Sequence, residues 1–226
     1  MPTIAERYRG PADLPQRLAF FPLRGAILLP RATLPLQVFE PRYLQMIEDV
    51  MASSRVLGIV QPAGGEEESP PGKTAELRRV GGVGRITAYQ ELDDGHLLVT
   101  LTGVARCVLR EEAATDRPYR ICAVSYAAYA GDFVAGSGED EVDRQGLLKA
   151  LKTYLAARNL KADWSAISKS SNETLINSLA MVSPYDAEEK QALLEAASLQ
   201  ARAQALVALA EMELAAGAGG SGSTLQ

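Results

Sequence analysis

The sequence has 226 residues, of which 47% are hydrophobic and 23% charged, so a disordered or collagen-like chain is excluded. A chain of this length buries a core large enough to fold without disulfides or metal ions. No apolar run approaches the ~20 residues of a membrane span, and the N-terminal segment MPTIAERYRGPADLPQRL lacks the apolar stretch of a signal peptide. We therefore expect a soluble, cytoplasmic protein.

The net charge of −5 is unevenly distributed along the chain. Residues 1–131 hold 15 Lys and Arg against 15 Asp and Glu, whereas residues 132–226 hold 8 against 13. Each phosphate contact needs a cationic side chain that displaces counterions, and neither part of the chain is basic. The charge distribution therefore disfavours nucleic acid as a partner, although a local cluster of arginines stays open.

Three prolines mark the first predicted strands. Pro22, Pro30 and Pro35 fall within Arg17–Val38, and proline removes a backbone donor from a sheet, so we expect short or edge strands there. A helix is predicted over Pro41–Ser53, because its apolar residues recur at helical spacing and Pro suits a first helical turn.

The run Phe39-Glu40-Pro41-Arg42-Tyr43 lies where this strand region meets the helix. Glu40 is expected to accept hydrogen bonds from the free N–H groups at the helix N-terminus. Phe39 and Tyr43 are expected to pack beneath it. This pattern predicts a structural corner, and a partner-binding role for the rim of the corner is the alternative.

Period-two patterns predict the remaining strands. The segments are Arg55–Val60, Val83–Leu92, His96–Arg110 and Tyr119–Tyr129. The run Asp93-Asp94-Gly95 is typical of a tight hairpin turn, so the second and third of these segments should pair with each other.

Within His96–Arg110, the odd-numbered positions are uncharged and predict a buried face, whereas the even-numbered positions, Arg106 included, predict a wetter face. Gly103 predicts a bend or bulge. A hairpin turning near residues 114–115 would bring Cys107 and Cys122 opposite each other. A cross-strand disulfide and two reduced, buried thiols both fit this spacing, and a cytosolic chain favours the thiols.

The chain changes character near residue 131. The acidic, glycine-containing segment Ala130–Glu141 predicts a linker with few buried contacts. Beyond it the apolar pattern becomes helical. Three helices are predicted there: Leu147–Leu155 with a left-handed end near Asn159, Leu175–Leu179 capped by Ser171 or Asn172, and one long helix from Ser183-Pro184 toward Leu214. We divide the chain into a β-rich part (1–131), a helical bundle (132–216) and a flexible tail (217–226).

No set of catalytic residues emerges from the sequence. Gly72-Lys73-Thr74 resembles the end of a phosphate-binding loop, but three glutamates precede it and no helix is predicted after it, so residues 62–75 are predicted to be a solvated loop. His96 is the only histidine, and with two cysteines it cannot complete a zinc site. We therefore predict no catalytic, cofactor-binding or metal-binding residues.

Five segments form a recognisable set, namely Phe21-Pro22-Leu23-Arg24, Leu34-Pro35-Leu36-Gln37-Val38-Phe39-Glu40-Pro41-Arg42-Tyr43, Val83-Gly84-Arg85-Ile86, Leu101-Thr102-Gly103-Val104-Ala105-Arg106 and Glu189-Lys190-Gln191-Ala192-Leu193-Leu194-Glu195. Together they resemble the N-terminal substrate-binding domain of Lon protease. The likeness spans roughly residues 16–214. It implies an α+β fold, in which a PUA-like pseudo-β-barrel is followed by a helical bundle with one long helix.

The resemblance also implies a function. In full-length Lon this region helps to recognise protein substrates and to assemble the hexamer. No position here matches the ATPase or Ser-Lys peptidase residues of the protease. We therefore expect a stand-alone, non-catalytic module that binds polypeptide or acts as an adaptor. RNA binding, suggested only by the PUA-like architecture, is the alternative, and the charge-neutral β-rich part argues against it.

Arginine supplies 14 of the 15 basic residues in the β-rich part. Its guanidinium stacks on aromatic rings and pairs bidentately with carboxylates, which suits protein interfaces. Arg24, Arg31, Arg42 and Arg85 are therefore candidates for a recognition surface, and a coding bias toward arginine is the alternative explanation.

Overall fold

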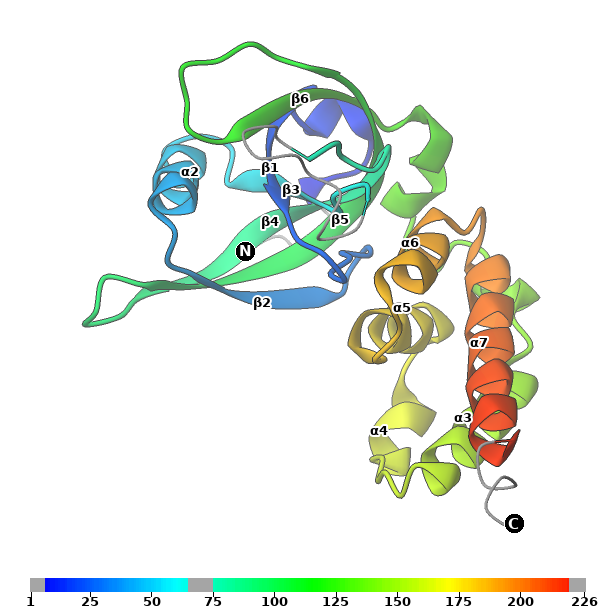
Figure 1. Cartoon of the computed structure of the whole chain (residues 1–226). Coiled ribbons are helices and arrows are strands. Elements are labelled where there is room, and N and C mark those ends of the chain that lie inside the picture. The colour runs from blue at the N-terminus through cyan, green and yellow to red at the C-terminus, as the bar shows by residue number, and fades with distance from the viewer. Residues whose placement is uncertain (1–6, 65–74, 220–226) are drawn as a thin grey trace.

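A computed structural model describes residues 7–64 and 75–219. A β-rich part and a group of helices lie side by side (Figure 1). The strands are β1 (Arg17–Pro22), β2 (Thr33–Val38), β3 (Val56–Val60), β4 (Val80–Glu91), β5 (Leu97–Glu112) and β6 (Arg120–Ser125). The helices are η1 (Pro11–Asp13), α2 (Pro41–Met51), η2 (Ala127–Phe133), η3 (Glu139–Glu141), α3 (Arg144–Ala157), α4 (Trp164–Lys169), α5 (Asn172–Val182), α6 (Ala187–Glu195) and α7 (Leu199–Gly219). The expected α+β fold is confirmed.

The six strands form a sheet that closes on itself. Their order is β2-β5-β4-β3-β1-β6, and β5 pairs with β6 as well. Strand β5 can pair with β2 near its start and with β6 near its end because it bends between them. At the bend Val83 lies opposite Ala105 but Gly84 lies opposite Gly103, which leaves Val104 as an extra residue. The expected bend at Gly103 is confirmed, and the closed sheet is the expected pseudo-barrel.

The core of the β-rich part has two clusters. One surrounds Phe20, Val83 and Cys107, and the other lies between the sheet and the buried face of α2, around Met46 and Ile47. Cys107 and Cys122 are both buried and free, as the cytosolic interpretation favoured, and burial raises the pKa of the Cys107 thiol to about 12.

The segment predicted to be an exposed linker is in fact packed. Asp132 and Phe133, in η2, are both buried, and the Phe133 and Tyr126 rings pack in a T-shaped arrangement with centroids 6.1 Å apart. The prediction of few buried contacts in Ala130–Glu141 is therefore wrong, because this segment supplies a hydrophobic anchor and a carboxylate to the interior. The division of the chain near residue 131 stays a prediction.

The alternation along β5 predicted that Arg106 faces solvent, and this prediction is wrong. Only 4% of Arg106 is exposed, because η2 and the end of α6 cover this side of the strand. Its guanidinium donates to both carboxylate oxygens of Asp132, at 2.9 and 2.8 Å, and to the carbonyls of Leu194 and Ala196, at 3.0 and 2.6 Å. A single arginine thus joins β5, the η2 segment and the C-terminal end of α6.

The single long helix predicted from Ser183-Pro184 is wrong. Helix α6 begins only after Asp186, whose carboxylate forms a reciprocal capping box with Glu189, and it ends before Ala196. The free carbonyls at its end accept bonds from Arg106 and from Arg202, whose Nε lies 2.9 Å from the Leu193 carbonyl. These two buried arginines take the place of the next helical turn, and α7 then starts separately.

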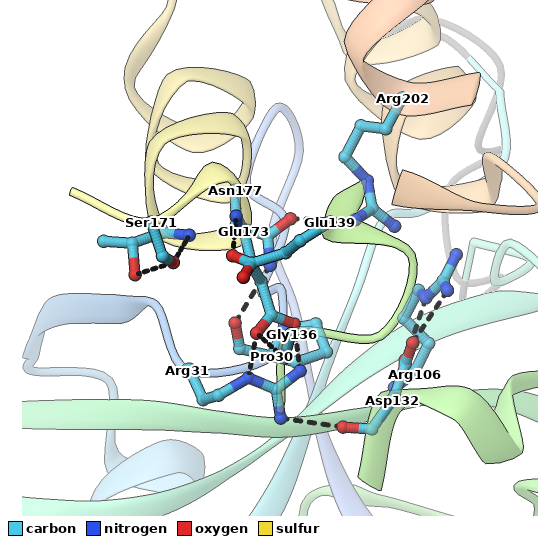
Figure 2. A network of polar contacts seen from close by, with 11 residues as sticks. Pro30, Arg31, Arg106, Asp132, Gly136, Glu139, Ser171, Glu173, Asn177 and Arg202 are labelled. Carbon is cyan, nitrogen blue, oxygen red and sulfur yellow. Dashed lines mark hydrogen bonds and ion pairs between the residues drawn. The ribbon is translucent and has the colours of Figure 1, made fainter. Parts of the chain in front are cut away.

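A second set of polar contacts fixes α5 against the β-rich part (Figure 2). Arg31 Nε donates to Glu173 at 2.7 Å, and the Asn177 side chain donates to the Pro30 carbonyl at 3.0 Å while it accepts from Arg202 at 2.8 Å. A third hydrophobic cluster, which includes Leu29 and Leu193, lies beside this network. The helices are therefore held to the sheet by apolar and ionic contacts together.

Two predicted helix ends in the helical part are confirmed. Asn159 has a left-handed backbone with φ of 53° just after α3, and the Ser171 hydroxyl accepts from Thr174 at the start of α5, at 3.2 Å. Helix α7 continues to Gly219, into the predicted tail. Gly72-Lys73-Thr74 lies outside the described residues. No helix in the described part of the chain is both long and apolar enough to cross a membrane.

Candidate functional site

A groove of about 840 Å³ lies beside the N-terminal half of α2. We call it the α2 groove, and its other wall is the segment 113–120 that leads into β6. Its apolar lining is Pro22, Tyr43, Pro62, Leu77, Pro118 and Tyr119, and its polar lining includes Arg42, Glu112, Thr115, Arg117 and Arg120. A hollow of about 590 Å³ shares Leu77, Glu112 and Arg120 with it, which extends the concave surface.

Tyr43 forms part of the groove wall. It projects from the first turn of α2 and packs against Phe21, with ring centroids 4.1 Å apart. The Arg42 guanidinium lies over its ring, 4.5 Å from the centroid. Burial raises the pKa of the Tyr43 phenol, so the group stays neutral at physiological pH. The expected packing of Tyr43 is confirmed.

The rest of the predicted corner is arranged differently. Glu40 occupies the N-cap position of α2, but its side chain makes no capping bond and instead accepts from Arg42 Nε at 2.9 Å. Phe39 is 58% exposed rather than packed beneath the helix. Val38 points inward at the end of β2, and side chains alternate along a strand, so the next residue is directed outward. Phe39 lies against His96 instead, with ring centroids 5.7 Å apart.

The far wall of the groove is tied to α2 through Asp49. The Tyr119 hydroxyl donates to Asp49 Oδ2 at 2.6 Å, and Arg117 Nη1 lies 3.0 Å from the same oxygen. Burial, together with the bond to Asp49, raises the pKa of Tyr119 to about 12. These contacts hold the two walls at a fixed separation, so the groove is formed before any ligand arrives.

Arg120 organises the end of the groove nearest to β6. It forms a forked ion pair with Glu112, which lowers the pKa of that carboxyl, and it donates to the Ala75 carbonyl at 2.6 Å. Three arginines and one glutamate therefore line the groove. Each of these arginines pairs with one carboxylate, namely Arg42 with Glu40, Arg117 with Asp49 and Arg120 with Glu112. Of the three carboxylates, only Glu112 lines the groove.

The structure does not gather the four arginines predicted to form a recognition surface. Arg42 lies in the groove, but Arg24 donates to the Gly64 carbonyl at 2.6 Å and Arg85 donates to the Tyr8 hydroxyl at 3.0 Å. Arg31 is committed to Glu173 in the contact with α5. Sequence reasoning also missed Arg117 and Arg120, although the run Arg117-Pro118-Tyr119-Arg120 repeats the combination of Pro, Arg and Tyr found at residues 41–43.

The chemistry of the groove suits binding. Its two phenols are neutral, and its guanidiniums offer several N–H donors above apolar walls. His96 lies outside the groove lining, where Nδ1 contacts Asp94 Oδ2 at 3.1 Å and the Gln37 amide at 3.2 Å. Within residues 7–64 and 75–219, no three His, Cys, Asp or Glu side chains are grouped closely enough to hold a metal ion.

Comparison with known proteins points to one family. A family model described as the substrate-binding domain of the ATP-dependent protease La (LON) matches residues 17–211. Lon protease from Flavobacterium johnsoniae is 26% identical over 212 residues, which cover 89% of this chain and 25% of the relative. Lon protease 2 from Myxococcus xanthus is 28% identical over 202 residues, which cover 87% of this chain and 24% of the relative. The chain thus spans about a quarter of the length of these relatives.

Two solved structures share the fold. The crystal structure of a Lon N-terminal domain protein from Xanthomonas campestris has a TM-score of 0.60 and 23% identity, covering 85% of this chain and 97% of that one. The N-terminal domain of Mycobacterium avium complex Lon protease has a TM-score of 0.63 and 16% identity, covering 86% and 98%. Identities this low support the architecture alone.

Proposed function

The chain belongs to the Lon substrate-binding domain family, and on that basis we propose that it is a non-catalytic module that binds unfolded polypeptide in the α2 groove. Membership in this family assigns the chain to substrate recognition. The proposal adds which surface binds the polypeptide and to which protein the polypeptide is then delivered. An adaptor that presents substrates to a protease or to another protein fits the same geometry.

The observation that carries the proposal is the pairing of an apolar wall with arginine donors in the α2 groove. Unfolded chains expose apolar side chains and backbone carbonyls that a folded protein hides. Pro22, Leu77 and Pro118, which line the groove and keep exposed surface, can contact the apolar side chains. Arg42 and Arg117, each about half exposed, can donate N–H groups to the backbone carbonyls. Such a site is selective for unfolded chain without reading a particular sequence.

We also propose a cytoplasmic location. The non-catalytic role and this location rest on separate observations. The stretches matched in two further Lon proteases cover only 14% and 12% of those relatives, and the family model concerns substrate binding alone. The two buried, free cysteines support a reducing compartment.

Arg117→Glu should weaken the binding of an unfolded, apolar peptide about tenfold, or about 1.4 kcal/mol. The substitution removes a guanidinium from the groove and places a second carboxylate beside Asp49. Fluorescence anisotropy with the labelled peptide measures the affinity. Because an exposed ion pair contributes only about 0.2–1 kcal/mol to folding, the variant should stay folded.

Arg158→Glu is the matched control. The Arg158 side chain is 52% exposed and pairs with Glu213, whereas the Arg117 side chain is 50% exposed and pairs with Asp49. Both variants change the net charge equally, but Arg158 lies at the end of α3, outside the groove. Equal peptide affinities of the two variants would contradict the assignment of the groove.

A further inference from the structure

The distal half of β4 has an open edge. Strand β3 pairs with β4 only from Gly82 to Arg85, and the last contact on that side is the Ile86 N–H to the Arg55 carbonyl, at 2.8 Å. From Thr87 to Glu91 the strand continues beside β5 in a hairpin that projects from the barrel (Figure 1). These five residues are exposed, and no other strand in the described part of the chain pairs with them on this side.

The backbone groups on this edge can be assigned from the hydrogen bonds at the turn. The Leu92 N–H donates to the His96 carbonyl at 2.9 Å. In an antiparallel ladder such bonds recur at every second residue, so Ala88 and Gln90 face β5. Tyr89 and Glu91 therefore direct their N–H and C=O groups away from β5, and the edge presents two donors and two acceptors to solvent.

The opposite edge of the same hairpin sheet is β2, and it is interrupted. The Gly103 N–H donates to the Ala32 carbonyl at 2.9 Å, so the same alternation directs Thr33, Pro35 and Gln37 away from β5. Proline has no N–H to donate, which blunts this edge against an added strand. On β4 the two outward donors, of Tyr89 and Glu91, belong to consecutive outward-facing residues, whereas on β2 Pro35 separates the donors of Thr33 and Gln37.

A second copy of this chain does not fit the β4 edge. Two-fold pairing centred on Tyr89 or on Gln90 would place the partner's hairpin turn where β3 and Arg55 already lie beside Ile86. Pairing centred on Glu91 would place two glutamates directly opposite each other, which is destabilising. The edge is thus suited to a single extended segment that carries no hairpin of its own.

The side chains around the edge indicate the chemistry of that segment. Tyr89 is 42% exposed and offers an aromatic surface for a cross-strand pair. Glu91 and Asp93 are exposed, and Asp94 lies beside them in the turn, so the tip of the hairpin is acidic. An added strand with Lys or Arg near the turn would complement this charge.

We propose that the Thr87–Glu91 edge of β4 binds an extended, basic polypeptide segment as an added strand. This inference rests on the proposed function, because it assigns a second contact to a polypeptide-binding module. Main-chain hydrogen bonds carry the recognition, so it tolerates many sequences. The acidic turn then selects for basic segments, a preference that the arginine-lined α2 groove does not supply.

The test compares Tyr89→Pro with Tyr89→Ala in the full chain. Both variants remove the phenol, but only proline removes the N–H that faces the open edge. The probe is a labelled peptide of alternating Thr and Val with two lysines at one end. We expect Tyr89→Pro to bind it at least tenfold more weakly than Tyr89→Ala. Glu91→Pro against Glu91→Gln repeats the comparison at the other outward residue, should Tyr89→Pro lower the melting temperature.

A modified probe gives the same test without changing the protein. N-methylation of alternate residues of the peptide removes the N–H groups along one of its edges. Methylation of one alternate set should abolish binding, whereas methylation of the other set should leave it unchanged. Equal binding of both methylated peptides, or equal affinities of the proline variants and their matched controls, would overturn the proposal.

The outcomes also separate this proposal from the proposed function. If Arg117→Glu weakens the binding of an apolar unfolded peptide while Tyr89→Pro leaves the lysine peptide bound, the β4 edge is refuted and the groove stands. If the unchanged protein binds neither peptide, both proposals are refuted.

Discussion

Arg106→Met is expected to lower the free energy of unfolding by about 3–5 kcal/mol. The substitution leaves the Asp132 carboxylate buried without its bidentate partner. It also removes the donor that satisfies the Leu194 and Ala196 carbonyls, where α6 ends. Because one side chain joins β5, η2 and α6, its loss should destabilise the β-rich part and the helices together.

Urea unfolding followed by circular dichroism measures the effect. Arg110→Met is the control, because Arg110 lies on the same face of β5 four residues later and is exposed, so its loss should stay within about 0.5 kcal/mol. Adding Asp132→Asn to Arg106→Met should recover part of the stability, since it removes the uncompensated charge. A loss below about 1 kcal/mol for Arg106→Met would contradict the role assigned to this arginine.

Gly103→Ala should cost about 3 kcal/mol or more through a steric clash. A Cβ atom at this position would lie 2.0 Å from the Leu29 carbonyl oxygen, a backbone atom that cannot turn aside. The close approach exists because the segment before β2 crosses β5 here, with the Arg31 N–H donating to the Gly103 carbonyl at 2.8 Å. The same crossing positions Arg31 for its contact with α5.

Gly131→Ala is the matched control for this clash. Its Cβ would meet only the Ser137 Oγ, at 3.5 Å, an ordinary contact. Thermal unfolding of the two variants should therefore differ by many degrees, with Gly131→Ala close to the unchanged protein. Similar melting temperatures would show that the backbone crossing at Gly103 is looser than the structure has it.

Local sequence patterns were enough to predict most of the β-rich part. The alternation from Leu97 to Leu109 predicted a strand with one buried face, and Asp93-Asp94-Gly95 predicted its hairpin turn. These features depend on residues close together in the sequence, so they could be predicted without knowledge of the tertiary structure. The Phe39–Tyr43 run likewise predicted a corner at the start of α2, where Arg42 and Tyr43 line the groove, although it did not predict the groove itself.

The errors share a physical cause, which is a partner distant in the sequence. Arg106 is buried because Asp132 and the end of α6 meet it, and the helix predicted through Ala196 breaks because Arg106 and Arg202 satisfy its carbonyls. The far wall of the groove depends in the same way on Asp49, which holds Tyr119 across 70 residues. The spacing of apolar residues within a segment carries no information about such distant contacts.

The central claim, that the chain binds unfolded polypeptide, is tested most directly by fluorescence anisotropy across a salt series. The probes are a labelled, uncharged apolar peptide and a labelled single-stranded RNA. We predict that the peptide binds and that its affinity changes little between low and physiological salt, because apolar contacts contribute most of the binding free energy. RNA binding would fall steeply with salt, with a slope of about −0.7 for each phosphate contacted. Tight, salt-dependent RNA binding without peptide binding would contradict the account.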